Sequence, residues 1–113
     1  MSSPVSDPVP QFDVFTNPGR QRDAIPFVVA LQNGRYEHAP TRLVAALISA
    51  RAIAVEEHHL APRFTVLGRP VVLDVFNLAT VPAARLGPVM ASLADEDSRA
   101  RLGRALDEFL SQA

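Results

Sequence analysis

The Asn-Gly pair at Asn33-Gly34 is the sequence feature that most constrains how this chain can fold. It follows residues 24–32, an apolar and β-branched segment with the composition of a buried strand. Asn-Gly between two such segments is a strong signal for a tight hairpin, because both residues tolerate the positive φ that the turn requires. The chain is therefore expected to return as an antiparallel strand that begins at residues 35–38.

The segment that follows, residues 41–50, is open to two interpretations. Its Ala and Leu content favours a helix, and Pro40 would fit in the first turn of that helix. A strand that returns from the hairpin predicts an extended segment instead, and Pro40 also biases Ala39 toward an extended conformation. We interpret residues 41–50 as a long, mostly buried strand, with the helix as the alternative.

Period-two patterns predict further strands. Residues 11–16 alternate in a way that predicts a strand with one apolar and one solvent-exposed face. A hairpin is predicted from residues 63–67, a turn that contains Gly68, and residues 71–78. Its second strand is apolar on both faces, which is typical of a central strand covered on two sides. A short strand is also predicted at residues 89–93.

The C-terminal segment has the pattern of an amphipathic helix. Its acidic start, Asp95, Glu96 and Asp97, suits the positive end of the helix dipole. One apolar stripe is predicted from the spacing of Leu102, Ala105, Leu106, Phe109 and Leu110. Strands followed by one helix indicate a mainly β or α+β fold, such as a small barrel. The 113 residues suffice for one domain, residues 11–113, after a flexible Ser- and Pro-rich segment at residues 1–10.

Composition excludes several classes of function. The net charge of −1 gives no general attraction to nucleic acid or to an anionic membrane surface. The chain has no Cys, which excludes disulfides and thiolate chemistry and agrees with a reducing cytosol. Its start lacks the pattern of a signal peptide, and no apolar segment is long enough to span a bilayer. A cytoplasmic protein is expected.

Candidate catalytic or metal-binding groups are few. The segment EEHH at residues 56–59 holds two carboxylates and two imidazoles, which are residue types that bind Zn²⁺ or transfer protons. Adjacent residues of an extended chain point to opposite faces, so we interpret this segment as a solvated loop. No motif of a known catalytic class is present. We therefore predict no catalytic residue, no cofactor and no metal site.

Four segments, in this order and spacing, resemble the CcdB toxin family. They are QFDVFTNPGR, VVALQN, HAPTRLVAAL and LGRPVVLDVFNLATVPAARLGPVMASL. The resemblance extends from Gln11 to the C-terminus, and it is their collinearity that makes it specific. It implies an SH3-like, barrel-type antiparallel sheet with one C-terminal helix, assembled as a homodimer. This agrees with a strand, and not a helix, at residues 41–50.

The resemblance also implies a function that is not catalysis. Members of the family are toxins of type II toxin–antitoxin modules, which insert between the A subunits of DNA gyrase and trap the cleaved-DNA complex. A cognate antitoxin neutralises them through a disordered tail that folds onto the toxin. The gyrase contact is carried by the end of the terminal helix and by a turn after the second strand. The matching residues here are Arg35, Tyr36, Asp107, Leu110, Ser111, Gln112 and Ala113.

The chain departs from the family at its last three residues. A Trp-Gly-Ile end is replaced by Ser111-Gln112-Ala113, so the aromatic anchor of the gyrase contact is missing. One alternative is therefore a non-toxic homologue that binds an antitoxin but not gyrase. Another is an endoribonuclease like the MazF-type toxins, which are similar in fold. The mild acidity and the lack of a clustered basic and catalytic constellation weigh against RNA cleavage.

Overall fold

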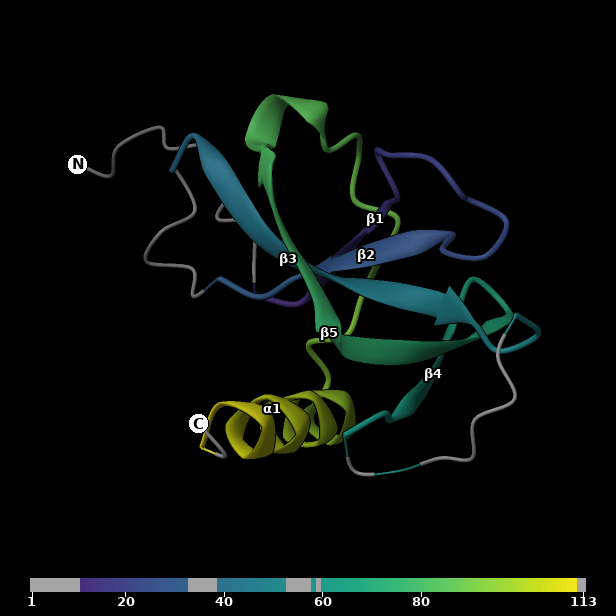
Figure 1. Ribbon diagram of the computed structural model, residues 1–113, viewed down its shortest axis with the longest axis vertical. Helices are drawn as coiled ribbons and strands as arrows, with labels where there is room; N and C mark the ends of the chain where they lie inside the picture. The colour runs from purple at the N-terminus through teal and green to yellow at the C-terminus, as the bar shows by residue number, and fades with distance from the viewer. Residues whose placement is uncertain (1–10, 33–38, 53–57, 59, 112–113) are drawn as a thin grey trace.

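A six-stranded antiparallel sheet, curved into a nearly closed barrel, forms the body of the protein, and one helix packs against it (Figure 1). The computed structural model describes residues 11–32, 39–52, 58 and 60–111. The elements are β1 (Asp13–Thr16), β2 (Phe27–Ala30), β3 (Thr41–Ser49), β4 (Arg63–Val66), β5 (Arg69–Pro82), η2 (Ala83–Arg85), β6 (Ala91–Ser92) and α1 (Glu96–Ser111). The strand order is β4-β5-β3-β2-β1-β6. The expected barrel-type sheet with one C-terminal helix is confirmed.

The strand interpretation of residues 41–50 is right, and the helix alternative is wrong. β3 pairs with β2 on one side, where Phe27 faces Leu47, and with β5 on the other. Both faces of β3 are buried around Val44 and Ala45, whereas a helix would bury only one stripe. Tertiary pairing has overridden the helix propensity of Ala and Leu. Asn33-Gly34 and residues 35–38 lie outside the described residues.

The hairpin predicted around Gly68 is also confirmed. β4 and β5 are joined by Leu67 and Gly68, whose φ angles are 51° and 78°. Two consecutive positive φ angles are the signature of a tight hairpin turn that matches the twist of the strands. β5 continues to Pro82, beyond the predicted end at residue 78, because it pairs with β3 up to Thr41.

A β-bulge in β5 overturns the prediction that this strand is covered on both faces. Val71 to Leu73 are buried, but Phe76 is 72% exposed. The adjacent residues Ala45 and Ala46 of β3 face Leu78 and Asp74, so β5 carries three extra residues between its two paired segments. The extra residues bend the strand sharply, as Figure 1 shows. The bend turns Phe76 away from the sheet.

The prediction of a solvent-exposed face on β1 is wrong. Val14 points into the main core, but Asp13 and Phe15 on the opposite face are buried as well. Phe15 belongs to a second apolar cluster with Val28, Ala30 and Val44, against which Val81 and Leu86 pack. The segment from the end of β5 through η2 thus covers a face that the local pattern assigned to solvent.

The helix α1 closes the main core. Asp95 caps it, with Oδ2 accepting a hydrogen bond from the Ser98 N–H at 3.0 Å, and this bond holds the pKa of Asp95 below its usual value. Leu102 and Ala105 are fully buried in the barrel core. The predicted apolar stripe ends earlier than expected, since Leu110 is 64% exposed. The helix extends beyond the part of the sheet that could cover that residue.

Arg101 fixes α1 to the edge strand β4. Its guanidinium lies 4.4 Å from the centroid of the Phe64 ring and donates to the backbone oxygen of Arg63. On the helix itself it pairs with Asp97 at 3.1 Å. The aromatic contact and the backbone hydrogen bond both join the helix to β4, so they set how the helix lies against the barrel.

Two leucines of α1 allow a test of this packing. Leu102→Ala is expected to lower the free energy of unfolding by about 2–5 kcal/mol, because it leaves a cavity in a fully buried site. Leu110→Ala, on the same helix but largely exposed, is expected to change it by no more than about 0.5 kcal/mol. Urea unfolding of both variants measures the difference. Equal losses would show that α1 does not pack as described.

Asp13 predicts a pH dependence of stability. The residue is 4% exposed, its carboxyl group accepts no hydrogen bond within the described part of the chain, and burial raises its pKa. Folding therefore favours the neutral acid, and this contribution is present below pH 3.8 and is lost as pH rises through the folded-state pKa. Asp13→Asn should gain stability relative to the parent chain between pH 3 and pH 7, by about 1.4 kcal/mol for each unit of the shift.

The control for this measurement is Asp107→Asn, at an exposed position of α1. Urea unfolding at several pH values should show a stability difference from the parent that rises with pH for Asp13→Asn, and more steeply than for the exposed Asp107→Asn. A flat difference for Asp13→Asn would contradict the burial of its carboxylate.

Candidate protein-binding site

The last turn of α1 brings together three of the residues expected to contact a partner. Asp107, Leu110 and Ser111 are all exposed, and their spacing of three and four residues places them on one side of the helix. The Ser111 hydroxyl donates to the backbone oxygen of Glu108 at 3.4 Å, so it is directed back along the helix. The other four expected residues, Arg35, Tyr36, Gln112 and Ala113, lie outside the described residues.

An aromatic pair that the sequence analysis missed lies beside this turn. The rings of Phe76 and Phe109 meet edge to face, with centroids 5.0 Å apart and planes at 83°. Phe109 packs against the main core, whereas Phe76 is mostly exposed. Phe109 therefore supports one side of the Phe76 ring, whose remaining surface faces outward. We name the five residues Asp107, Phe109, Leu110, Ser111 and Phe76 the helix-end surface.

The bulge in β5 determines where Phe76 lies. Within the bulge the Phe76 N–H donates to Oδ1 of Asp74 at 3.0 Å. The side chain of Asp74 thus takes the role that a neighbouring strand would have in a regular ladder. An Asp inside an otherwise apolar strand is the sequence signal that would have indicated the bulge, because Asp is depleted in strands.

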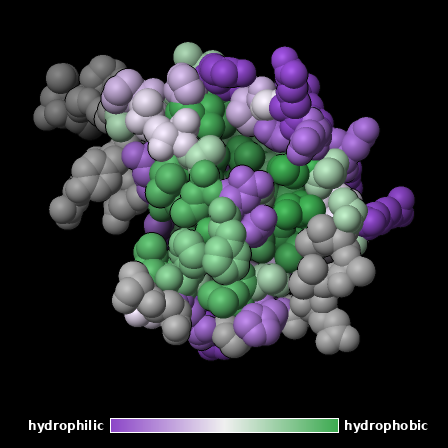
Figure 2. Space-filling model, in the orientation of Figure 1, coloured by the Kyte–Doolittle hydropathy of each residue, from purple (hydrophilic) through white to green (hydrophobic). Residues whose placement is uncertain are grey.

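Apolar side chains gather over the centre of the face that carries β3, β5 and α1 (Figure 2). The large exposed ones in the described residues are Leu43, Leu67, Phe76, Val89, Met90 and Leu110. Phe76 and Leu110 belong to the helix-end surface and are the most exposed of the set. A rigid aromatic and an aliphatic side chain at an exposed helix end are typical of a surface that binds another protein.

The expected EEHH loop is only partly visible. His58 is exposed, and its Nδ1 accepts a hydrogen bond from the Leu60 N–H at 3.1 Å. Glu56, Glu57 and His59 lie outside the described residues. Among the residues that the structure does describe, there is no group of three or more His, Cys, Asp or Glu side chains that could hold a metal ion. The described part of the chain also holds no helix with the length and apolar character needed to cross a membrane.

Comparison with protein families gives a match over most of the chain. The family model described as CcdB protein matches residues 11–111 of the 113 residues. The matched range begins just before β1 and ends at the last residue of α1, so it includes every strand and the helix-end surface. A search of curated proteins finds no match.

Proposed function

We propose that this chain, which belongs to the CcdB family of toxins from toxin–antitoxin modules, is a type II toxin whose target is the A subunit of DNA gyrase. In this proposal the toxin traps gyrase on cleaved DNA, and a cognate antitoxin neutralises it. It acts in the cytoplasm as a homodimer of a single domain, residues 11–113. Its activity is binding and not catalysis.

The helix-end surface supports a function in protein binding. Aromatic side chains dominate the energy of many protein interfaces when a partner desolvates them, and Phe76 is preplaced for such a contact by its edge-to-face packing on Phe109. Leu110, which directly follows Phe109 on α1, adds an exposed aliphatic side chain. Interfaces gain from side chains that are already ordered, because less conformational entropy is lost on binding.

The exposed Ser111 limits the expected affinity for gyrase. The family has a Trp here, and a buried Trp of about 200 Å² contributes roughly 5 kcal/mol at about 25 cal/mol per Å². Ser and Ala are depleted in interface cores. We therefore expect weak trapping of gyrase by the natural chain. This same residue favours the second candidate, a family member that binds its antitoxin but no longer poisons gyrase.

Gyrase supercoiling assays, paired with a binding titration against the A subunit, test the proposal. The natural chain should inhibit feebly, and the triple change Ser111→Trp, Gln112→Gly and Ala113→Ile should strengthen inhibition by at least about tenfold, since it restores the apolar anchor. Phe76→Ala should weaken whatever inhibition the natural chain shows. Leu67→Ala is the matched control, an exposed apolar residue in the β4–β5 turn, and should have no effect.

Two outcomes would contradict parts of this proposal. Strong inhibition by the natural chain would show that surfaces other than the last three residues carry the contact, with Arg35 and Tyr36 the first to test. No gain from the triple change would indicate a target other than gyrase and support the second candidate. RNA cleavage by the purified protein would instead identify an endoribonuclease.

Assembly is tested separately. We expect light scattering at micromolar concentration to give about twice the chain mass of 12.2 kDa. The physical reason is the apolar surface that the described residues leave exposed outside the helix-end surface, at Leu43, Val89 and Met90, which a second copy would cover. A mass of one chain over the whole concentration range would rule out the homodimer.

A further inference from the structure

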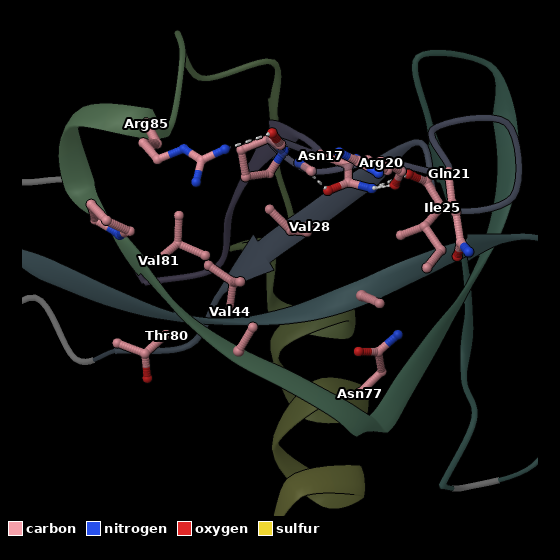
Figure 3. A pocket seen from close by; sticks show the side chains of 15 residues that line it. Asn17, Arg20, Gln21, Ile25, Val28, Val44, Asn77, Thr80, Val81 and Arg85 are labelled. Atoms are coloured by element: carbon pink, nitrogen blue, oxygen red, sulfur yellow. Dashed lines mark hydrogen bonds between the residues drawn. The ribbon is translucent and has the colours of Figure 1, made fainter.

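A cavity of about 380 Å³ lies on the outer face of the barrel, away from the helix-end surface (Figure 3). Its floor is the sheet formed by β2, β3 and β5, and its walls are the turn after β1 and the segment around η2. The volume is within the range of sites that hold a small ligand or a few side chains of a peptide. No residue of the helix-end surface lines it.

The floor of the cavity is apolar, with two alanines among four β-branched side chains. It is formed by Ile25, Val28, Val44, Ala46, Ala79 and Val81. Ala46 and Ala79 leave space on the sheet where larger residues would fill it. A floor of this kind accepts an aliphatic side chain from a partner, because the apolar surface of both is then removed from water.

One wall is a rigid turn built around Asn17. Its side-chain oxygen accepts from the Gly19 N–H at 2.8 Å, and its side-chain nitrogen donates to the backbone oxygens of Arg20 and Ile25, each at 2.9 Å. Arg22 Nε donates to the Asn17 backbone oxygen at 2.8 Å. All of these bonds are internal to the turn, so the wall is in place before any ligand arrives.

The rim of the cavity is positively charged. Among the described residues that line it are two arginines, Arg20 and Arg85, and no aspartate or glutamate. Arg85 comes from η2 and donates from Nη2 to the Pro18 backbone oxygen at 3.4 Å, so it reaches across toward the turn (Figure 3). Arg20 is exposed, and its guanidinium makes no hydrogen bond or ion pair to a described residue. Both charges are available to a ligand.

We propose that this cavity binds an acidic peptide segment, with one aliphatic side chain over Ala46 and Ala79 and neighbouring carboxylates on Arg20 and Arg85. Charge complementarity favours an acidic occupant, since an arginine fork pairs well with a carboxylate and no acidic group competes for it in the described lining. The segment belongs to the cognate antitoxin, so this inference rests on the proposed function. The antitoxin then holds the toxin at a place separate from the helix-end surface.

Calorimetric titration of the full chain with a synthetic peptide tests the site. The probe is acetyl-Glu-Glu-Leu-Asp-Glu-amide, compared with acetyl-Gln-Gln-Leu-Asn-Gln-amide, which has the same shape without charge. The acidic peptide should bind at least about tenfold more tightly, and its affinity should fall as salt is raised. Equal binding of the two peptides, or no binding of the acidic one at millimolar concentration, would overturn the proposal.

Three variants separate the site from general electrostatics. Arg20→Gln should weaken the acidic peptide about tenfold, and it removes no contact that the described structure uses. Arg104→Gln is the matched control, because it removes the same charge from an exposed position of α1 and should change affinity less than about twofold. Ala79→Leu should abolish binding by filling the floor. Equal effects of Arg20→Gln and Arg104→Gln would show non-specific attraction and overturn the site.

The result is independent of the gyrase assay. Peptide binding that depends on Arg20 and Ala79 supports the cavity even when the chain does not inhibit gyrase, in which case only the choice of target fails. Gyrase inhibition without peptide binding supports the toxin and overturns the cavity. Amide chemical shifts that move at Gly19 and Ala46, but not at Leu110, would confirm where the peptide lies.

Discussion

The pairing of β3 with strands on both of its sides is the interaction on which the rest of the structure depends. All nine residues of β3 pair with β5, and four of them, residues 44–47, also pair with β2. Residues of these two ladders contribute to both apolar clusters. The break in register between Ala45 and Ala46 occurs within the same strand. The barrel core, the outer cavity and the exposed ring of Phe76 all follow from how β3 is paired.

The local patterns predicted the elements better than they predicted the faces. β3 was predicted correctly because an antiparallel partner before it decides between strand and helix when composition does not. The burial of Phe15 was missed because the residues that cover it, Val81 and Leu86, lie far along the chain. The exposure of Phe76 was missed because the change of register at the bulge removes this side chain from the face of the sheet to which the alternation in β5 assigns it.

In the candidate site, too, local spacing accounts for some residues and tertiary contacts account for the others. The resemblance assigns Asp107, Leu110 and Ser111 to a partner contact, which stays a prediction, and helix spacing alone brings these three exposed residues together at the end of α1. Phe76 joins them only through the tertiary contact with Phe109, about thirty residues away in sequence, which no periodicity encodes. The cavity on the outer face has no sequence motif either. It exists because small residues of β3 and β5 lie opposite a turn that Asn17 holds together.

The hydrogen bond between Asp74 and Phe76 has a consequence for how this surface can diverge. It is made to the main chain of residue 76 and not to the ring, so the backbone position is fixed whatever side chain is attached. A substitution at residue 76 removes no ladder bond and little core packing, since most of the ring is outside the core. Selection can therefore change the chemical identity of the displayed group one mutation at a time, at little cost to the barrel. The bulge therefore fixes the backbone at residue 76 and leaves the exposed side chain there free to change.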